Sequence, residues 1–190
     1  EGYFSVENDD LKLGFAESSR QKDEFETFLI DLGVPASEIT FQAATYSELD
    51  RSLYNDTGKI IGYEPYYKLT QEFEIRSNDV PSVEKASRKI SDVLDKGIRI
   101  NMYSPRYYYT KLADLKHEMI KKATDDARDR AEIIATQSGG VLGELRDARM
   151  GVFQITGQYS DEDYSWGGSF NTADKEKTAS ITINLTYESN

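Results

Sequence analysis

One apolar residue at every fourth position between residues 119 and 135 constrains the fold more than any other feature of the sequence. These residues are Met119, Ala123, Ala127, Ala131 and Ala135. On a helix of 3.6 residues per turn, such a stripe winds by about 40° per step. Its small side chains let the helix backbone lie close to a flat partner. The spacing therefore predicts a long helix over residues 115–138, with Asp114 as its N-cap, packed against a β-sheet.

Two further helices are expected on the same kind of evidence. Helical spacing of apolar residues runs from Asp9 or Asp10 to residue 32, where Gly33 and Pro35 end it. A second helix starts near Pro81 and ends at Gly97. Its apolar stripe is Val83, Ala86, Ile90, Val93 and Leu94.

Strands are expected where apolar and polar residues alternate. The clearest covers residues 67–76, and period-2 alternation of this kind favours an antiparallel sheet with one buried face. Weaker strands are predicted at residues 39–46, 150–156 and 181–187, with a turn at residues 55–58. Another strand starts at Ile98 and runs toward Tyr107–Tyr109. Residues 3–6 read as the end of a strand whose beginning is missing.

The resulting order, β-α-β-β-α-β-α-β-β, predicts an α+β fold. Helices are expected on one face of a mainly antiparallel, twisted sheet. We expect a single domain over residues 3–188, interrupted by a long acidic loop at residues 158–177.

Composition excludes several classes of protein. The chain has 190 residues, a net charge of −11 and no cysteine. The acidic balance argues against binding to nucleic acid or to anionic lipid, and the absence of cysteine removes disulfides and thiolate chemistry. No apolar run approaches the length of a transmembrane helix. We expect the chain to be a mature or trimmed product, in which a removed signal peptide or lipid anchor would not be visible.

Three blocks of the sequence, in order, resemble the SIMPL domain family. The most specific is the alanine-spaced stripe closed by Gly139-Gly140-Val141-Leu142-Gly143, and the others cover residues 25–40 and 63–73. The resemblance implies no catalytic residues for this chain, because the members of the family share no catalytic residue set. It also implies export to the bacterial periplasm or cell envelope, where some members assemble into large rings. An animal member is instead an adaptor in innate immune signalling.

The densest aromatic cluster is the candidate interaction surface. It comprises Tyr103, Arg106, Tyr107, Tyr108 and Tyr109, and Trp166 in the acidic loop joins it as a candidate anchor. Tyrosine and arginine are enriched at protein interfaces, although packing within the sheet is the simpler explanation. Alternation would place Tyr107 and Tyr109 on one face of a strand and Tyr108 on the other.

No catalytic, cofactor-binding or metal-binding residues are predicted. His117, the only histidine, reads as a surface residue. Asp125, Asp126 and Asp129 read as partners in ion pairs within their helix. Residues 161–167 begin like a calcium loop, but Thr172 stands where that loop needs a bidentate glutamate.

The sequence therefore predicts a non-enzymatic, exported envelope protein that binds proteins. The expected partners are further copies of itself, as a homo-oligomer, and unidentified envelope proteins. The alternatives are a periplasmic binder of small ligands or cations, a signalling adaptor, and a hydrolase that uses carboxylates.

Overall fold

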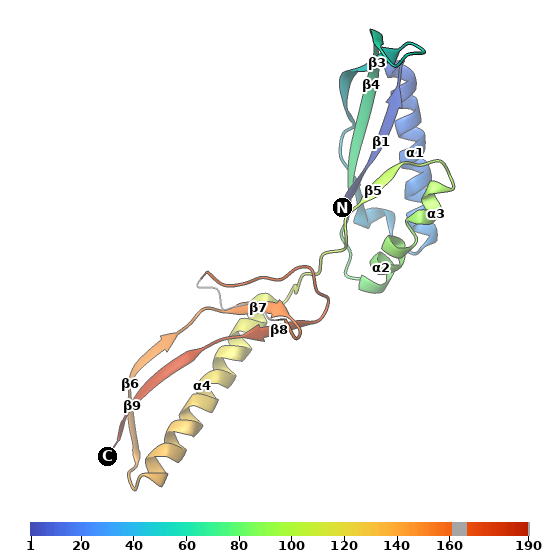
Figure 1. The fold of residues 1–190 in the computed structure, drawn as a ribbon. Coiled ribbons are helices and arrows are strands. Elements are labelled where there is room, and N and C mark those ends of the chain that lie inside the picture. The colour runs from blue at the N-terminus through green and yellow to red at the C-terminus, as the bar shows by residue number, and fades with distance from the viewer. Residues whose placement is uncertain (161–166, 190) are drawn as a thin grey trace. The chain divides into compact units, whose positions relative to one another are not determined.

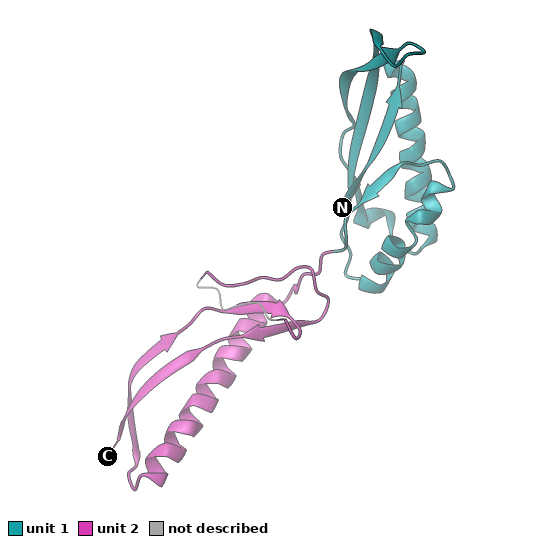
Figure 2. Cartoon of the chain, viewed as in Figure 1, with its two compact units in different colours: residues 1–105 teal, residues 106–190 magenta. Residues whose placement is uncertain are grey.

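The computed structural model describes residues 1–160 and 167–189. Its backbone divides into two compact units, residues 1–105 and residues 106–190 (Figure 2). Each unit combines helical structure with antiparallel strands, which confirms the predicted α+β class. The single domain over residues 3–188 remains a prediction.

Unit 1 is built on the long strand β4 (Figure 1). Its sheet has the order β2-β4-β1-β5, β3 also pairs with β4, and all of these pairs are antiparallel. In chain order the elements are β1 (Gly2–Asn8), α1 (Leu11–Asp31), a 3-10 turn (Ala36–Glu38), β2 (Ile39–Phe41), β3 (Thr45–Tyr54), β4 (Ile60–Ile75), α2 (Val80–Arg88), α3 (Ser91–Leu94) and β5 (Ile100–Met102).

Helix α1 begins and ends where the sequence predicts. The Asp10 side chain accepts a hydrogen bond from the backbone N–H of Leu13 at 2.9 Å, which makes it the N-cap. After the last turn, Gly33 takes a φ of +100°, a left-handed conformation that glycine adopts without strain.

The core of unit 1 lies between α1 and the sheet. Leu69 and Phe73 of β4 are buried, whereas Lys68 and Glu72, the residues just before them, are exposed, so the predicted alternation is confirmed. The Phe25 ring of α1 meets the Phe73 ring at a centroid distance of 4.8 Å. Side chains from α2 and α3 join the same core. One face of the sheet is therefore covered by helices.

Several predictions for unit 1 are wrong in their bounds. The strand expected at residues 39–46 is two strands, and β3 continues to Tyr54. The helix expected up to Gly97 breaks into α2 and α3, and Leu94 is exposed instead of facing the core. Strand β5 stops at Met102, so no strand reaches Tyr107–Tyr109.

Unit 2 is a long two-stranded ribbon with one helix. It contains α4 (Leu112–Gln137), β6 (Leu142–Met150), β7 (Gln154–Gly157), β8 (Lys177–Ser180) and β9 (Ile183–Ser189). Strand β6 pairs with β9 and β7 pairs with β8, both antiparallel. Since β6 leads into β7 and β8 leads into β9, the two pairs follow one another along the ribbon. Helix α4 contacts β9 and, less extensively, β6.

The alanine stripe of α4 lies on its covered side. Ala135 is buried, and Met119, Ala123, Ala127 and Ala131 are half-buried. The predicted packing of this stripe against a sheet is therefore confirmed, although that sheet has two strands among the described residues.

The other corrections in unit 2 concern ends of elements. Asp114 is not the N-cap of α4, because the helix begins at Leu112 and Lys111 occupies the cap position without a side-chain hydrogen bond. The strand expected at residues 150–156 is interrupted at residues 151–153, and the one at residues 181–187 begins only at Ile183.

Candidate interaction surfaces

The residues of the predicted aromatic surface between 103 and 109 form neither a helix nor a strand. We call residues 103–109 the tyrosine segment. Tyr103, Tyr108 and Tyr109 are exposed, with 67% of the Tyr108 surface accessible, and Tyr107 is half-buried. Tyr103 belongs to unit 1, whereas Arg106 and the other tyrosines belong to unit 2. The predicted alternation of faces is wrong because no strand forms here. Trp166 lies outside the described residues.

A shallow acidic cavity adjoins Tyr103. It has a volume of about 290 Å³ and is lined by Glu1, Gly2, Tyr3, Gln42, Glu72, Phe73, Glu74 and Tyr103. Its carboxylates suit a cationic guest better than an anion, and the carboxylate of Glu74 also accepts a hydrogen bond from Arg76 Nε at 2.7 Å. Within the described residues no three His, Cys, Asp or Glu side chains are grouped to hold a metal ion.

Six exposed apolar side chains of unit 1 lie toward the free end of the β3–β4 hairpin, on both of its faces, because Leu53 pairs with Gly62 whereas Tyr63 pairs with Ser52. Strand β1 pairs with β4 only from Tyr67 onward, so residues 60–66 have β3 as their strand partner. Ile61 and Tyr63 are 65% and 66% exposed. We define the hairpin end by its exposed apolar residues, Leu49, Leu53, Tyr54, Ile60, Ile61 and Tyr63.

The hairpin end is held firmly by its turn and its base. In the turn, the Asn55 side chain accepts hydrogen bonds from the backbone N–H groups of Thr57 and Lys59 at 3.1 and 2.9 Å. At the base, Arg51 pairs with Asp9 at 3.2 Å and lies 4.9 Å from the centre of the Tyr66 ring. The apolar side chains are therefore presented by an ordered support.

Sequence reasoning predicted the turn at residues 55–58 but missed the surface around it. The available signal was the group of large apolar residues on both sides of that turn, which does not alternate with polar residues. Alternation indicates a strand with one buried face. Nearly all residues of β3 are exposed, so β3 has no buried face that such a pattern could reveal.

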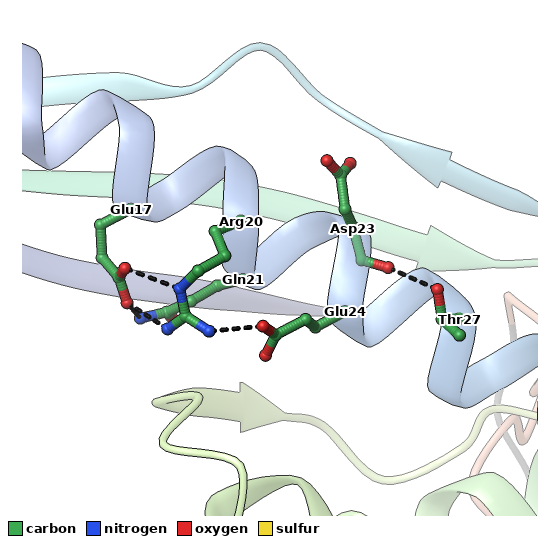
Figure 3. A network of polar contacts seen from close by, with 6 residues as sticks. All are labelled: Glu17, Arg20, Gln21, Asp23, Glu24 and Thr27. Atoms are coloured by element: carbon green, nitrogen blue, oxygen red, sulfur yellow. Dashed lines mark hydrogen bonds and ion pairs between the residues drawn. The ribbon is translucent and has the colours of Figure 1, made fainter.

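The charged side chains on α1 form a helix-stabilising network (Figure 3). Arg20 donates to Glu17 through Nε and Nη2 at 2.8 and 2.5 Å and to Glu24 through Nη1 at 2.6 Å. Gln21 also donates to Glu17. These hydrogen bonds from Arg20 and Gln21 lower the pKa of the Glu17 carboxyl from 4.5 to about 2. All the partners lie on one helix, so the network stabilises α1.

In unit 2, a lysine joins the start of α4 to two phenylalanine rings. Lys116 Nζ lies 5.3 Å from the centre of the Phe153 ring and 5.8 Å from that of Phe170. Ile155 of β7 bridges to Phe170, and its N–H donates to the Ser169 carbonyl at 2.7 Å. These contacts fasten the segment around Phe170 to the ribbon.

The remaining sequence candidates lie on the exposed side of α4 or outside the described residues. His117 is exposed, as predicted. Asp126 pairs with Arg130 at 3.0 Å, which confirms an intrahelical ion pair for this aspartate. Glu118 accepts a hydrogen bond from Lys122, which lowers the pKa of its carboxyl. The calcium-like motif begins at residues 161–166, which are not among the described residues.

Comparison with known proteins identifies the family. Among the described helices, none combines the length and the hydrophobicity that crossing a lipid bilayer requires. No curated protein matches the sequence. The family model of SIMPL, a protein of unknown function (DUF541), matches residues 2–187, and the chain therefore belongs to the SIMPL family.

Proposed function

We propose that this chain is a non-enzymatic envelope protein that works by binding proteins, first of all further copies of itself. The hairpin end carries this proposal, because it presents large apolar side chains to solvent on an ordered support. Ile61 and Tyr63 are among the most exposed apolar side chains of unit 1, and tyrosine is enriched among residues that anchor interfaces. Export to the envelope rests on the resemblance to bacterial SIMPL proteins.

The experiment compares two variants of the full chain by sedimentation velocity from micromolar to millimolar concentration. In the first, Ile61→Ser and Tyr63→Ser remove the apolar side chains from the hairpin end. The matched control is Ile133→Ser on α4, which removes an apolar side chain of similar exposure, 62%, from another place. The hairpin variant should form smaller assemblies than the unmodified chain, and the control should not. Equal assembly of all three proteins would contradict the proposal.

The acidic cavity beside Tyr103 favours a second candidate, the binding of a small organic cation. Its tyrosines and carboxylates supply the aromatic faces and negative charge that such a ligand requires. A thermal-shift panel of alkylammonium compounds tests this, because a ligand that binds the folded state raises the melting temperature. Glu72→Gln should abolish any such shift, and an unchanged shift in this variant would rule the cavity out.

A further inference from the structure

Strand β6 presents a row of apolar side chains that α4 does not cover. Each of them stands directly opposite a half-buried residue of β9: Leu145 opposite Tyr187, Ala148 opposite Leu185, and Met150 opposite Ile183. Directly opposed residues of an antiparallel ladder have their side chains on the same face of the sheet. Helix α4 covers this face at β9, which it contacts more extensively than β6, whereas residues 144–150 are all exposed. The row on β6 therefore lies beside α4 and is open to solvent.

The backbone groups beside this row point to an open edge. The N–H of Gly151 donates to the carbonyl of Thr182 at 2.7 Å, so residue 151 turns its backbone groups toward the β9 side. Alternate residues of an antiparallel strand turn these groups to opposite sides. The N–H and C=O groups of Ala148 and Met150 therefore point away from β9, where β6 pairs with no strand among the described residues.

The charges of β6 complement those of a second β6 strand. Asp147 and Arg149 lie on the other face of the ladder, opposite exposed residues of β9, and Arg149 Nε donates to Asp147 at 2.8 Å. When two β6 strands pair antiparallel with Ala148 opposite its own copy, Asp147 of each chain stands opposite Arg149 of the other. A shift by one residue in either direction instead places Asp147 or Arg149 opposite its own copy. Opposite charges across a ladder stabilise it and like charges destabilise it, so the charges select the first register.

The net charge of this edge also permits two copies to meet. The chain as a whole carries a net charge of −11, which opposes the approach of a second copy. Residues 144–150 contain two acidic and two basic residues, so the edge of β6 has no net charge.

The position of α4 leaves room for pairing at β6 and not at β9. Neighbouring strands lie about 4.8 Å apart, whereas packed helices need about 8–10 Å between their axes. In a sheet of the order β9-β6-β6-β9, the two helices above the β9 strands are three strand spacings apart, about 14 Å. The apolar rows of both β6 strands fill the space between them. Pairing of β9 with β9 would bring the helices within about 5 Å of one another, where they clash.

We infer that β6 pairs antiparallel with β6 of a second copy of this chain, about a two-fold axis at Ala148. The pairing joins the two ribbons into one four-stranded sheet with both α4 helices on the same face. Register shifts between Leu142 and Asp147 keep the regular part of the edge short, so the contact closes as a two-fold dimer. This inference rests on the proposed self-association and adds a contact in unit 2 to the hairpin end in unit 1.

The first test uses the absence of cysteine from the chain. Ala148→Cys places a thiol at the two-fold axis, where opposed α-carbons lie about 5.5 Å apart, within the range of a disulfide. The matched control is Thr186→Cys, also exposed and in the same ribbon, because the two β9 strands are too far apart in the dimer to be linked. Both variants are equilibrated in a glutathione redox buffer, and circular dichroism checks that each is folded. Ala148→Cys should accumulate several times more disulfide-linked homodimer than the control.

A charge exchange then tests the register. Asp147→Arg and Arg149→Asp are each added to the Ala148→Cys chain. Each substitution places like charges opposite one another, so each chain alone should form less disulfide-linked homodimer. In an equimolar mixture, opposite charges face one another at both places. The mixture should therefore form mainly the heterodimer, which mass spectrometry distinguishes from the two homodimers.

Three results would overturn the inference. They are equal disulfide formation by Ala148→Cys and Thr186→Cys, a random distribution of homodimers and heterodimers in the charge exchange, and a thiol at position 148 that is shielded from alkylation in monomers. The last result would show that β6 is covered by its own chain.

The same experiments separate this inference from the proposed function. The disulfide reports the β6 contact alone, whereas Ile61→Ser with Tyr63→Ser reports the hairpin end through total assembly. Assembly without the disulfide overturns the β6 contact only, and the disulfide with unchanged assembly of the hairpin variant overturns the hairpin end only. A chain that forms neither assemblies nor the disulfide overturns both.

Discussion

The Leu69 side chain lies so close to Gly14 of α1 that a β-carbon at this position would force one of the two to move. Leu69 Cδ1 is 2.5 Å from the position that a β-carbon on Gly14 would occupy, and Leu69 is buried in the core. Gly14 therefore allows α1 to approach β4 closely.

Gly14→Ala should destabilise unit 1 although it favours the helix. Alanine gains about 1 kcal/mol over glycine inside a helix, but overpacking a core costs roughly 1–3 kcal/mol. We expect a net loss of about 1 kcal/mol in the free energy of unfolding, measured by urea titration. Gly62→Ala is the matched control, because its nearest neighbour is Leu53 Cδ1 at 3.9 Å. An equal effect of both substitutions would contradict this account of the contact.

The Glu17 network should make stability depend on pH in the acid range. The folded pKa of the Glu17 carboxyl, about 2, lies below its ordinary value of 4.5. The stabilisation is therefore fully present above pH 4.5 and is lost as the pH falls toward 2. Because Glu17 and Arg20 are partly exposed and solvent screens their interaction, we expect this contribution to the free energy of unfolding to be only about 0.5–1 kcal/mol.

Glu17→Gln is the variant that checks this pH dependence. Its unfolding free energy should fall below that of the unmodified chain at pH 6, and the difference should vanish near pH 2. Carbon-13 NMR gives the pKa directly, and titration of the Glu17 carboxyl near 4.5 would show that the network does not hold in solution.

Lys116 should stabilise unit 2 through its charge. Lys116→Met keeps most of the aliphatic side chain but removes the cation that lies near the Phe153 and Phe170 rings. The expected loss is about 0.5–1 kcal/mol in unfolding free energy. Lys121→Met removes a charge from an exposed position of the same helix and should have little effect. The two lysine substitutions are then repeated in a Phe153→Leu chain. If they now change the unfolding free energy equally, the contribution of Lys116 is assigned to its contact with the Phe153 ring.

The sequence predicted best those elements whose local signals agree with their packing. Asp10 and Gly33 mark both ends of α1, and the alternation around Leu69 marks the buried face of β4. The alanine spacing of α4 likewise identifies its covered side. In each case the residues that start, stop or bury an element lie within that element.

The prediction failed where structure depends on pairing with distant residues. Strand β6 carries the charged residues Glu144, Arg146, Asp147 and Arg149 without alternation, and it is a strand because β9 pairs with it. The tyrosine segment has strand-forming residues, yet it pairs with no strand of its own chain among the described residues. Propensity alone cannot supply a partner.

Self-association is the central claim, and the mass of the unmodified chain in solution tests it most directly. Sedimentation equilibrium from micromolar to millimolar concentration should give a weight-average mass that rises above the 21.6 kDa of one chain. A mass that stays at 21.6 kDa over the whole range would contradict it.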